Sequence, residues 1–206
     1  MTFYNEIIKN LYIGSIESSE NFDFIKQNNI SVIINCTKDI NDKFSLNLLK
    51  PIEDAPENVQ KWLYNNSYYI KYYRIPVDDN GKEEEIINFY KYVIKILPII
   101  YNAYNNGKNI LVHCLAGNQR SAAFVAIFVM IYKKITLKES MDYLITKKPN
   151  VFFFGSRINF IDAMTKIENV RDVNGLEYIL DDKRLHKINN SMSDAIKDAD
   201  EFNDYM

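Results

Sequence analysis

The sequence of 206 residues contains few cysteines and histidines and no long hydrophobic run. The two cysteines, Cys36 and Cys114, are too few for a disulfide scaffold and form no Cys-x-x-Cys pair of a zinc site. The two histidines, His113 and His186, have no carboxylates around them at metal-ligand spacing, so we expect neither a metal nor another cofactor. Because no apolar run is long enough to span a bilayer, we also expect no membrane partner.

The chain has no excess of charge of one sign. Its 25 Lys and Arg residues face 27 Asp and Glu residues, which gives a formal net charge of -2. Proteins that bind nucleic acid usually carry a basic excess, so no nucleic-acid partner is expected. The first residues lack the apolar stretch and the cleavage site of a secretory signal. Together with the scarcity of cysteine, this predicts an intracellular location, in the cytoplasm or the nucleus.

Strand and helix patterns alternate along most of the chain. Short apolar or β-branched runs predict strands at residues 11–14, 30–35, 68–75 and 109–113. Apolar residues at helical spacing predict helices at residues 19–26, 83–104, 121–134, 137–147 and 157–170. Ser19 is the expected N-cap of the first of these helices, and Pro98 predicts a kink or break in the second. We therefore expect an α/β domain with a central, mostly parallel sheet of about five strands flanked by helices.

Two regions do not follow this pattern. Residues 38–67 are polar and predict a long connection with one short helix at residues 57–64. Residues 171–206 form a polar, acidic C-terminal extension that we expect to be partly helical and partly disordered. The apolar residues at 176–180 predict a contact with the core or with a second copy of the chain. A homodimer formed through this extension is therefore a further hypothesis.

One segment combines a strand, a loop of small and polar residues, and the start of an apolar helix. Backbone amides of such a loop can converge on one oxyanion, and the helix N-terminus adds partial positive charge at the same point. Gly117 permits the backbone conformation that wraps a loop around a phosphate, and Arg120 offers a planar pair of donors to two phosphate oxygens. The loop residues expected to bind phosphate are Leu115, Ala116, Gly117, Asn118 and Gln119.

Cys114 stands at the base of this loop. The converging amides, the helix end and Arg120 all favour negative charge, so we expect a thiol pKa well below the usual value of about 8.5. Such a thiolate can attack a phosphate monoester and form a cysteinyl-phosphate. Ser121 can donate to the sulfur and help it leave when water hydrolyses that intermediate. A cysteine after a strand is more often just a small buried residue, but the order His, Cys, Ala-Gly, Arg-Ser favours the catalytic interpretation.

The segment His113–Ser121, His-Cys-Leu-Ala-Gly-Asn-Gln-Arg-Ser, resembles the signature loop of the dual-specificity branch of the protein tyrosine phosphatases. Leu11–Gly14, the strand that ends at Asn35, Ile75–Asp79 and the helices after the loop are similar to the same family. The resemblance implies a protein tyrosine phosphatase-like fold, with the catalytic domain in residues 1–170. It also implies that the histidine before the cysteine supports the loop and the thiolate by hydrogen bonding.

A leaving alkoxide or phenolate needs a proton, so a carboxylic acid has to reach the loop from another strand. The residues alone leave two candidates, Asp78 and Asp79, in the loop that follows the strand at 68–75. The resemblance selects Asp79, because the acid of the family stands four residues after the isoleucine that Ile75 matches. It also stands about ten residues before an aromatic, which Phe89 matches.

The resemblance implies a dual-specificity protein phosphatase that hydrolyses phosphotyrosine and phosphoserine or phosphothreonine in phosphorylated protein substrates. The chain shows no counterpart of the loop that deepens the pocket of tyrosine-specific phosphatases. A phosphoinositide phosphatase and an RNA 5′-triphosphatase are less favoured, because lysines in the loop and a basic surface are absent. A phosphoprotein-binding pseudophosphatase is the other alternative, although Cys114, Arg120 and Asp79 are all present.

Three features depart from the family, and the C-terminal extension at residues 171–206 is one of them. The connection at residues 38–67 is longer than in compact members. Arg157 stands where the family often has the Asn of a Pro-Asn pair, which predicts altered support of the signature loop or an added basic contact. Cys36 ends a strand that we expect to lie near the loop, so a reversible Cys36–Cys114 disulfide that protects the nucleophile is a further hypothesis.

Overall fold

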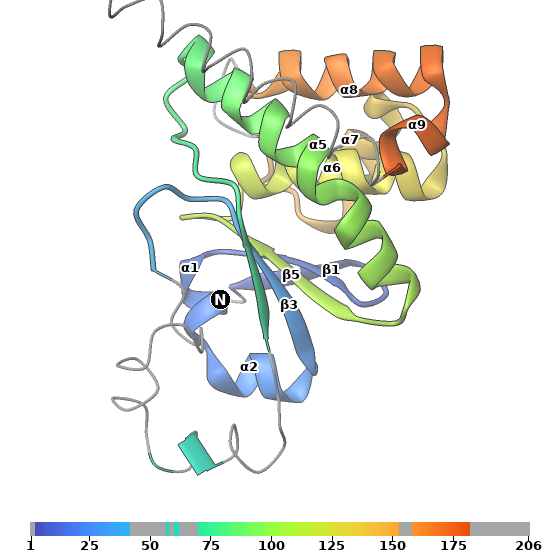
Figure 1. Cartoon of the computed structure of the whole chain (residues 1–206). Helices are drawn as coiled ribbons and strands as arrows, with labels where there is room; N and C mark the ends of the chain where they lie inside the picture. The colour runs from blue at the N-terminus through green and yellow to red at the C-terminus, as the bar shows by residue number, and fades with distance from the viewer. Residues whose placement is uncertain (1–2, 42–56, 58–59, 62–69, 153–157, 182–206) are drawn as a thin grey trace, which may run out of the picture.

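The computed structural model describes residues 3–41, 57, 60–61, 70–152 and 158–181, which form a five-stranded sheet with helices on both faces (Figure 1). In spatial order the strands are β1-β2-β5-β3-β4; β1 and β2 pair antiparallel, and all other pairs are parallel. The α/β fold with a mostly parallel sheet is therefore confirmed. The strand bounds are β1 Tyr4–Ile8, β2 Leu11–Gly14, β3 Ile30–Asn35, β4 Lys71–Arg74 and β5 Asn109–His113.

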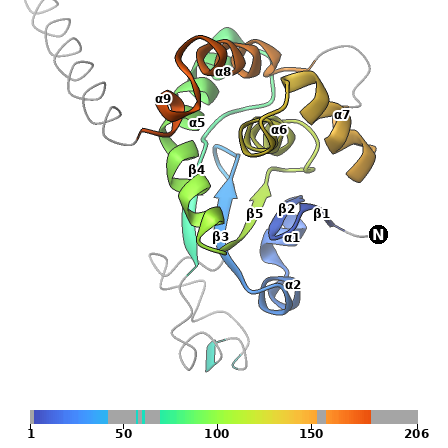
Figure 2. The ribbon, with the colours of Figure 1, turned by 90° about the vertical axis from the view of Figure 1, so that its right-hand side faces the viewer.

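The helices form two layers of unequal size, as Figure 2 shows. Two short helices, α1 (Ile16–Glu20) and α2 (Phe22–Gln27), cover one face of the sheet. The larger layer on the other face consists of α5 (Glu83–Asn105), α6 (Arg120–Lys133), α7 (Leu137–Lys147), α8 (Ile161–Asn174) and α9 (Leu176–Leu180). The main hydrophobic core lies between this larger layer and the sheet.

The centre of the fold is formed by β5 and α6. β5 lies between β2 and β3, and its residues Ile110 to His113 are buried. Every residue of α6 from Ser121 to Ile131 is buried as well, which explains why its sequence is apolar on all sides. Because β5 ends at the carboxyl edge of a parallel sheet and α6 starts there, the loop between them lies where α/β proteins usually bind ligands.

The predicted helix at residues 19–26 is wrong in its N-cap and its length. The chain forms two helices that meet at Asn21, whose side-chain oxygen accepts the N–H of Phe24 at 3.0 Å and caps α2. Ser19 lies inside α1 instead, where its hydroxyl donates to the carbonyl of Ile16 at 2.8 Å. Asn caps a helix as readily as Ser, so the sequence offered two starts and the structure uses the second.

The structure differs from the sequence-based expectations at two further places, Pro98 and β1. Of the kink or break expected at Pro98, a break does not occur, because α5 continues to Asn105. Pro98 is buried between Leu97 and Ile100 in the core, and this burial offsets the backbone hydrogen bond that proline cannot donate. β1 was not predicted, because it is an edge strand in which only Ile7 is buried, so its sequence lacks a clear alternation.

The described part of the chain continues past residue 170. α8 runs to Asn174, and α9 packs on α5 and α8 through Ile179, which is 4% exposed. The expected contact of residues 176–180 with the core is thus present. The rest of the extension and the expected start of α8 at residue 157 lie outside the described residues. Of the connection helix expected at 57–64, only residues 57, 60 and 61 are described, and they are helical.

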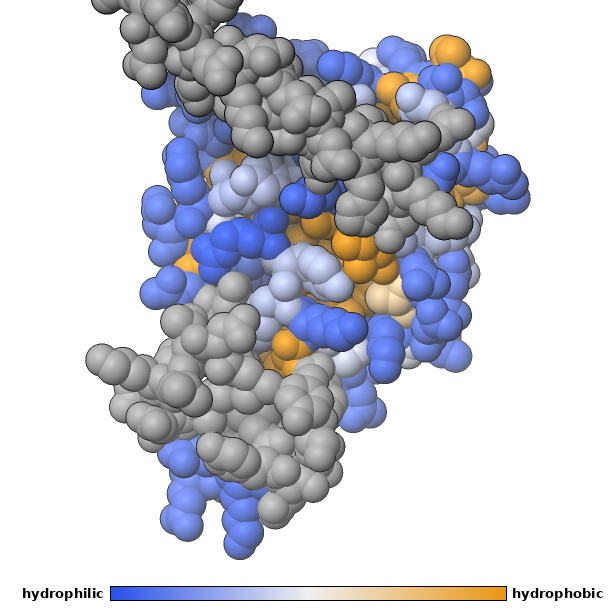
Figure 3. Space-filling view, viewed as in Figure 1, coloured by the Kyte–Doolittle hydropathy of each residue, from blue (hydrophilic) through white to orange (hydrophobic). Residues whose placement is uncertain are grey.

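In the face drawn in Figure 3, hydrophobic residues gather in the middle, with hydrophilic residues to the left and right of them. Across the described ranges, no helix combines the length and the apolar character needed to cross a membrane.

Candidate active site

The loop between β5 and α6 is held by backbone hydrogen bonds from two sides. On one side, Cys114 donates its N–H to the carbonyl of Gly14 at 3.4 Å, and Ile16 donates its N–H to the carbonyl of Leu115 at 3.2 Å. On the other side, the N–H of Phe152 donates to the carbonyl of Asn118 at 3.0 Å. The end of β2, the start of α1 and the residues after α7 thereby fix the shape of the loop, which leaves the remaining loop amides available to an anion.

Gly117 meets two requirements that other residues would not. Its φ of +74° lies in the left-handed region, and a Cβ there would lie 2.8 Å from the carbonyl oxygen of Gly14. Its N–H also points at the sulfur of Cys114, at an N–S distance of 3.2 Å. The glycine therefore lets the loop curl tightly around Cys114, as the sequence predicted.

Cys114 is almost fully buried, with 2% of its surface exposed. Its sulfur accepts hydrogen bonds from the amide of Gly117 at 3.2 Å and from the hydroxyl of Ser121 at 3.3 Å. Burial alone would raise the pKa of the Cys114 thiol. The hydroxyl and amide of Ser121, the charge of Arg120 and the amide of Gly117 outweigh burial, so the pKa is lowered.

Arg120, the first residue of α6, joins this loop to the loop after β4. Its Nη1 donates to the carbonyl of Val77 at 3.2 Å. Its Nε is buried and has no hydrogen-bond partner among the described residues. A buried, unpaired guanidinium nitrogen is costly, so this geometry favours a bound anion at Arg120.

The two candidate acids after β4 have different surroundings. Asp78 is engaged, because its N–H donates to Glu85 Oε2 at 3.0 Å and its carboxylate lies 3.7 Å from Lys38 Nζ. Asp79 is exposed, and its Oδ1 accepts a hydrogen bond from Asn159 Nδ2 at 2.6 Å. The carboxylate of Asp78 is thus held in an ion pair, which favours Asp79 as the proton donor.

Sequence reasoning missed two residues that form hydrogen bonds with this loop, Glu85 and Asn159. Glu85 is 5% exposed, and the Asp78 N–H that it accepts is the main reason why its pKa is lowered, with burial acting against this and Lys38 adding to it. Its spacing of four residues before the buried Phe89 places it on the inner face of α5, which was a usable signal. Asn159 precedes α8 and had no such signal.

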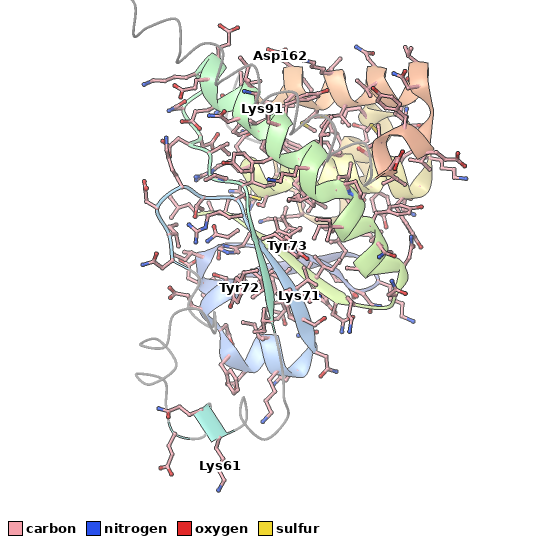
Figure 4. All side chains as sticks on the ribbon, viewed as in Figure 1. Lys61, Lys71, Tyr72, Tyr73, Lys91 and Asp162 are labelled. Atoms are coloured by element: carbon pink, nitrogen blue, oxygen red, sulfur yellow. The ribbon has the colours of Figure 1, made fainter. Side chains whose placement is uncertain are left out.

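A groove of about 560 Å³ lies beside this loop, between α5 and α8. Gly81 lines its end nearest the two aspartates, and Lys91 and Asp162 line it from the two helices (Figure 4). Its apolar lining comes from Ile86, Ile87, Tyr90 and Ala163. Among the described residues, no group of three or more His, Cys, Asp or Glu side chains could hold a metal ion.

His113 and Cys36 lie at the ends of adjacent strands. His113 is buried, and its carbonyl accepts the N–H of Cys36 at 2.8 Å. Burial raises the pKa of the Cys36 thiol well above its usual value, and the nearby charge of Cys114 adds to this. Both cysteines are free thiols. Arg157 lies outside the described residues, so its expected contact stays a prediction.

The opposite pKa shifts of the two thiols predict different reactivity. At pH 7 we expect iodoacetamide to alkylate Cys114 at least about tenfold faster than Cys36, because only the thiolate reacts. The lowered pKa of Cys114 also means that its alkylation rate should reach half its maximum at a lower pH than that of an unperturbed cysteine thiol. Mass spectrometry of peptides taken over a pH series measures both rates. Equal labelling of the two cysteines in the folded protein would contradict the described site.

The fold and the loop that curls around Cys114 agree with one class of protein, the phosphatases of the protein tyrosine phosphatase type. The sequence matches the dual specificity phosphatase catalytic domain over residues 11–170. The chain therefore belongs to the dual specificity phosphatase family, as the signature loop predicted, and it is a protein phosphatase.

Similar proteins agree with this assignment. A putative tyrosine phosphatase 123R of Invertebrate iridescent virus 6 is 27% identical over 166 residues, which cover 79% of this chain and 90% of the viral protein. Human dual specificity protein phosphatase 6 is 25% identical over 163 residues, but these cover only 36% of that protein and 77% of this chain.

Solved structures support the fold. Human DUSP28 has a TM-score of 0.62 at 16% identity, with 84% of this chain and 97% of that chain covered. DUSP15 has a TM-score of 0.62 at 19% identity, with 85% and 94% covered.

Proposed function

We propose that this protein is a dual-specificity phosphatase that hydrolyses phosphotyrosine, phosphoserine and phosphothreonine in proteins through a cysteinyl-phosphate intermediate. The observation that carries the proposal is the environment of Cys114, a buried sulfur with two donors at 3.2 and 3.3 Å and a lowered pKa. The name of human dual specificity protein phosphatase 6 supports a phosphoprotein substrate and the dual specificity, and the name of the viral relative supports phosphotyrosine.

In the first step, the Cys114 thiolate attacks phosphorus. The S–P bond forms while the P–O bond to the substrate breaks, and protonated Asp79 gives its proton to the leaving oxygen. The backbone amides of residues 115–119 and Arg120 hold the phosphoryl oxygens, on which the charge of the transition state gathers. The unpaired Nε of Arg120 supports this role. A phosphoryl oxygen would accept its hydrogen bond, for which the described residues provide no acceptor.

In the second step, water hydrolyses the cysteinyl-phosphate. Asp79, now a carboxylate, takes a proton from the attacking water while the S–P bond breaks and its electron pair returns to the sulfur. The Ser121 hydroxyl, 3.3 Å from the sulfur, stabilises the thiolate as it leaves. Inorganic phosphate is released, and Cys114 is ready to react again.

Hydrolysis of two phosphopeptides in excess EDTA tests the proposal. We expect turnover of both a phosphotyrosine and a phosphothreonine peptide, with rates that EDTA does not change, because Arg120 and backbone amides carry the charge of the transition state. Turnover of the phosphotyrosine peptide alone would restrict the enzyme to tyrosine. Tight binding of both peptides without release of phosphate would overturn the proposal in favour of a phosphoprotein-binding module.

A further inference from the structure

Three hydrogen bonds connect residues 77–79, in the loop that carries the proposed acid, to other parts of the fold. Glu85 accepts the N–H of Asp78 at 3.0 Å, and Arg120 donates to the carbonyl of Val77 at 3.2 Å. These two contacts bind the carbonyl and the N–H of the peptide group that joins Val77 to Asp78. They therefore fix the backbone of the loop at this peptide group. The third contact, from Asn159 Nδ2 to Asp79 Oδ1 at 2.6 Å, acts on the carboxyl group itself.

Asn159 has a firm position from which to act. The next residue, Phe160, is 1% exposed and packs on Phe89 of α5, with 4.6 Å between ring centroids. The start of α8 is thereby fixed to the same helix that carries Glu85. On the other side, Gly81 has a φ of +70°, and a Cβ there would lie only 3.3 Å from Asn159 Oδ1. The glycine lets the loop approach Asn159 closely enough for the hydrogen bond.

We infer that Asn159 is a positioning residue that orients the Asp79 carboxyl for proton transfer; this rests on the proposed role of Asp79. An exposed carboxyl group can rotate, and either oxygen can carry the proton. The amide of Asn159 can only donate at Nδ2, so the oxygen that it binds is the one without the proton. Oδ2 then holds the proton and is free to meet the leaving oxygen. Because the reacting carboxyl group is already oriented, the entropic cost of orienting it does not add to the activation free energy.

The readout that identifies such a role is the dependence of the rate on the leaving group. For Asn159→Ala, we expect kcat/KM on a phosphotyrosine peptide, which reports the first step and not the later hydrolysis of the intermediate, to fall about tenfold, because the phenolate needs the proton. On difluoromethylumbelliferyl phosphate, whose leaving group is much more acidic, kcat/KM should fall less than about twofold. Asn169→Ala, the same change at an exposed position of α8, is the control and should alter neither rate.

Asp79→Asn separates this inference from the proposed function. It should itself lower kcat/KM for the phosphotyrosine peptide far more than for the difluoro substrate, and adding Asn159→Ala should then lower kcat/KM no further. If Asp79→Asn acts as expected but Asn159→Ala slows both substrates equally, or adds its full effect to Asp79→Asn, Asn159 is merely structural and the inference is wrong. If Asp79→Asn has no such effect, the acid itself is wrong, and the role of Asn159 falls with it. Should Asn159→Ala fail to fold, Asn159→Ser is subject to the same criteria.

Discussion

Replacing Cys114 by serine is expected to lower kcat on a phosphotyrosine peptide by at least about 10⁴-fold. The sulfur is an effective nucleophile because its surroundings lower its pKa, whereas a serine hydroxyl in the same place stays protonated. The loop amides and Arg120 are unaffected, so the variant should still bind the peptide. Steady-state kinetics and titration calorimetry measure the two effects separately.

Cys36→Ala is the matched control for this experiment. Cys36 is the other buried thiol, and its N–H bonds to the carbonyl next to Cys114, but burial keeps its pKa high. We expect the kcat of the Cys36→Ala variant to stay within about twofold of wild type, because Cys36 takes no part in the proposed reaction. A Cys114→Ser variant that kept its activity while Cys36→Ala lost it would contradict the account.

The second large effect is expected for Arg120→Lys, with kcat/KM about 10³-fold lower. Lysine keeps the positive charge but loses the planar pair of donors and the Nε–H, which is buried and unpaired among the described residues. It also cannot reach Val77 with the same geometry, so the loop that carries Asp79 loses one of its contacts. The inhibition constant of inorganic phosphate should rise in the same variant.

Arg171→Lys is the control for the loss of a guanidinium. Arg171 donates to the carbonyl of Ile135 at 2.6 Å, on α8 and far along the chain from the signature loop. Its replacement should lower stability without changing kcat/KM. If Arg120→Lys behaved like Arg171→Lys, the guanidinium of Arg120 would not be the phosphate clamp.

The centre of the site could be predicted from the sequence because its parts are adjacent in the chain. Cys114, Gly117, Arg120 and Ser121 lie within one strand-loop-helix segment, and the chemical requirements of an anion loop select residue types at each position. The strands β3 and β5 were predicted for a similar reason, since each is a short run of apolar residues. The pattern does not indicate which acid serves the loop.

The choice between Asp78 and Asp79 needed the family resemblance, and only the structure shows that the two have different partners. Glu85, the partner of Asp78, lies at the start of α5. Asn159, the partner of Asp79, is the residue before Phe160. A contact between residues 80 positions apart depends on how helices pack on each other, which periodicity does not encode. The predicted start of the helix that contains α2 was wrong for a simpler reason. Two good capping residues, Ser19 and Asn21, stand close together.

The most direct test of the central claim is to trap the covalent intermediate. Ser121→Ala removes the hydroxyl 3.3 Å from the sulfur, which should slow the second step more than the first. We would denature this variant during turnover of a phosphotyrosine peptide in EDTA and locate the phosphoryl group by mass spectrometry. The account predicts one phosphoryl group on Cys114, absent when Cys114→Ser is added. Turnover with the phosphoryl group on another residue, or with none on the protein, would contradict it.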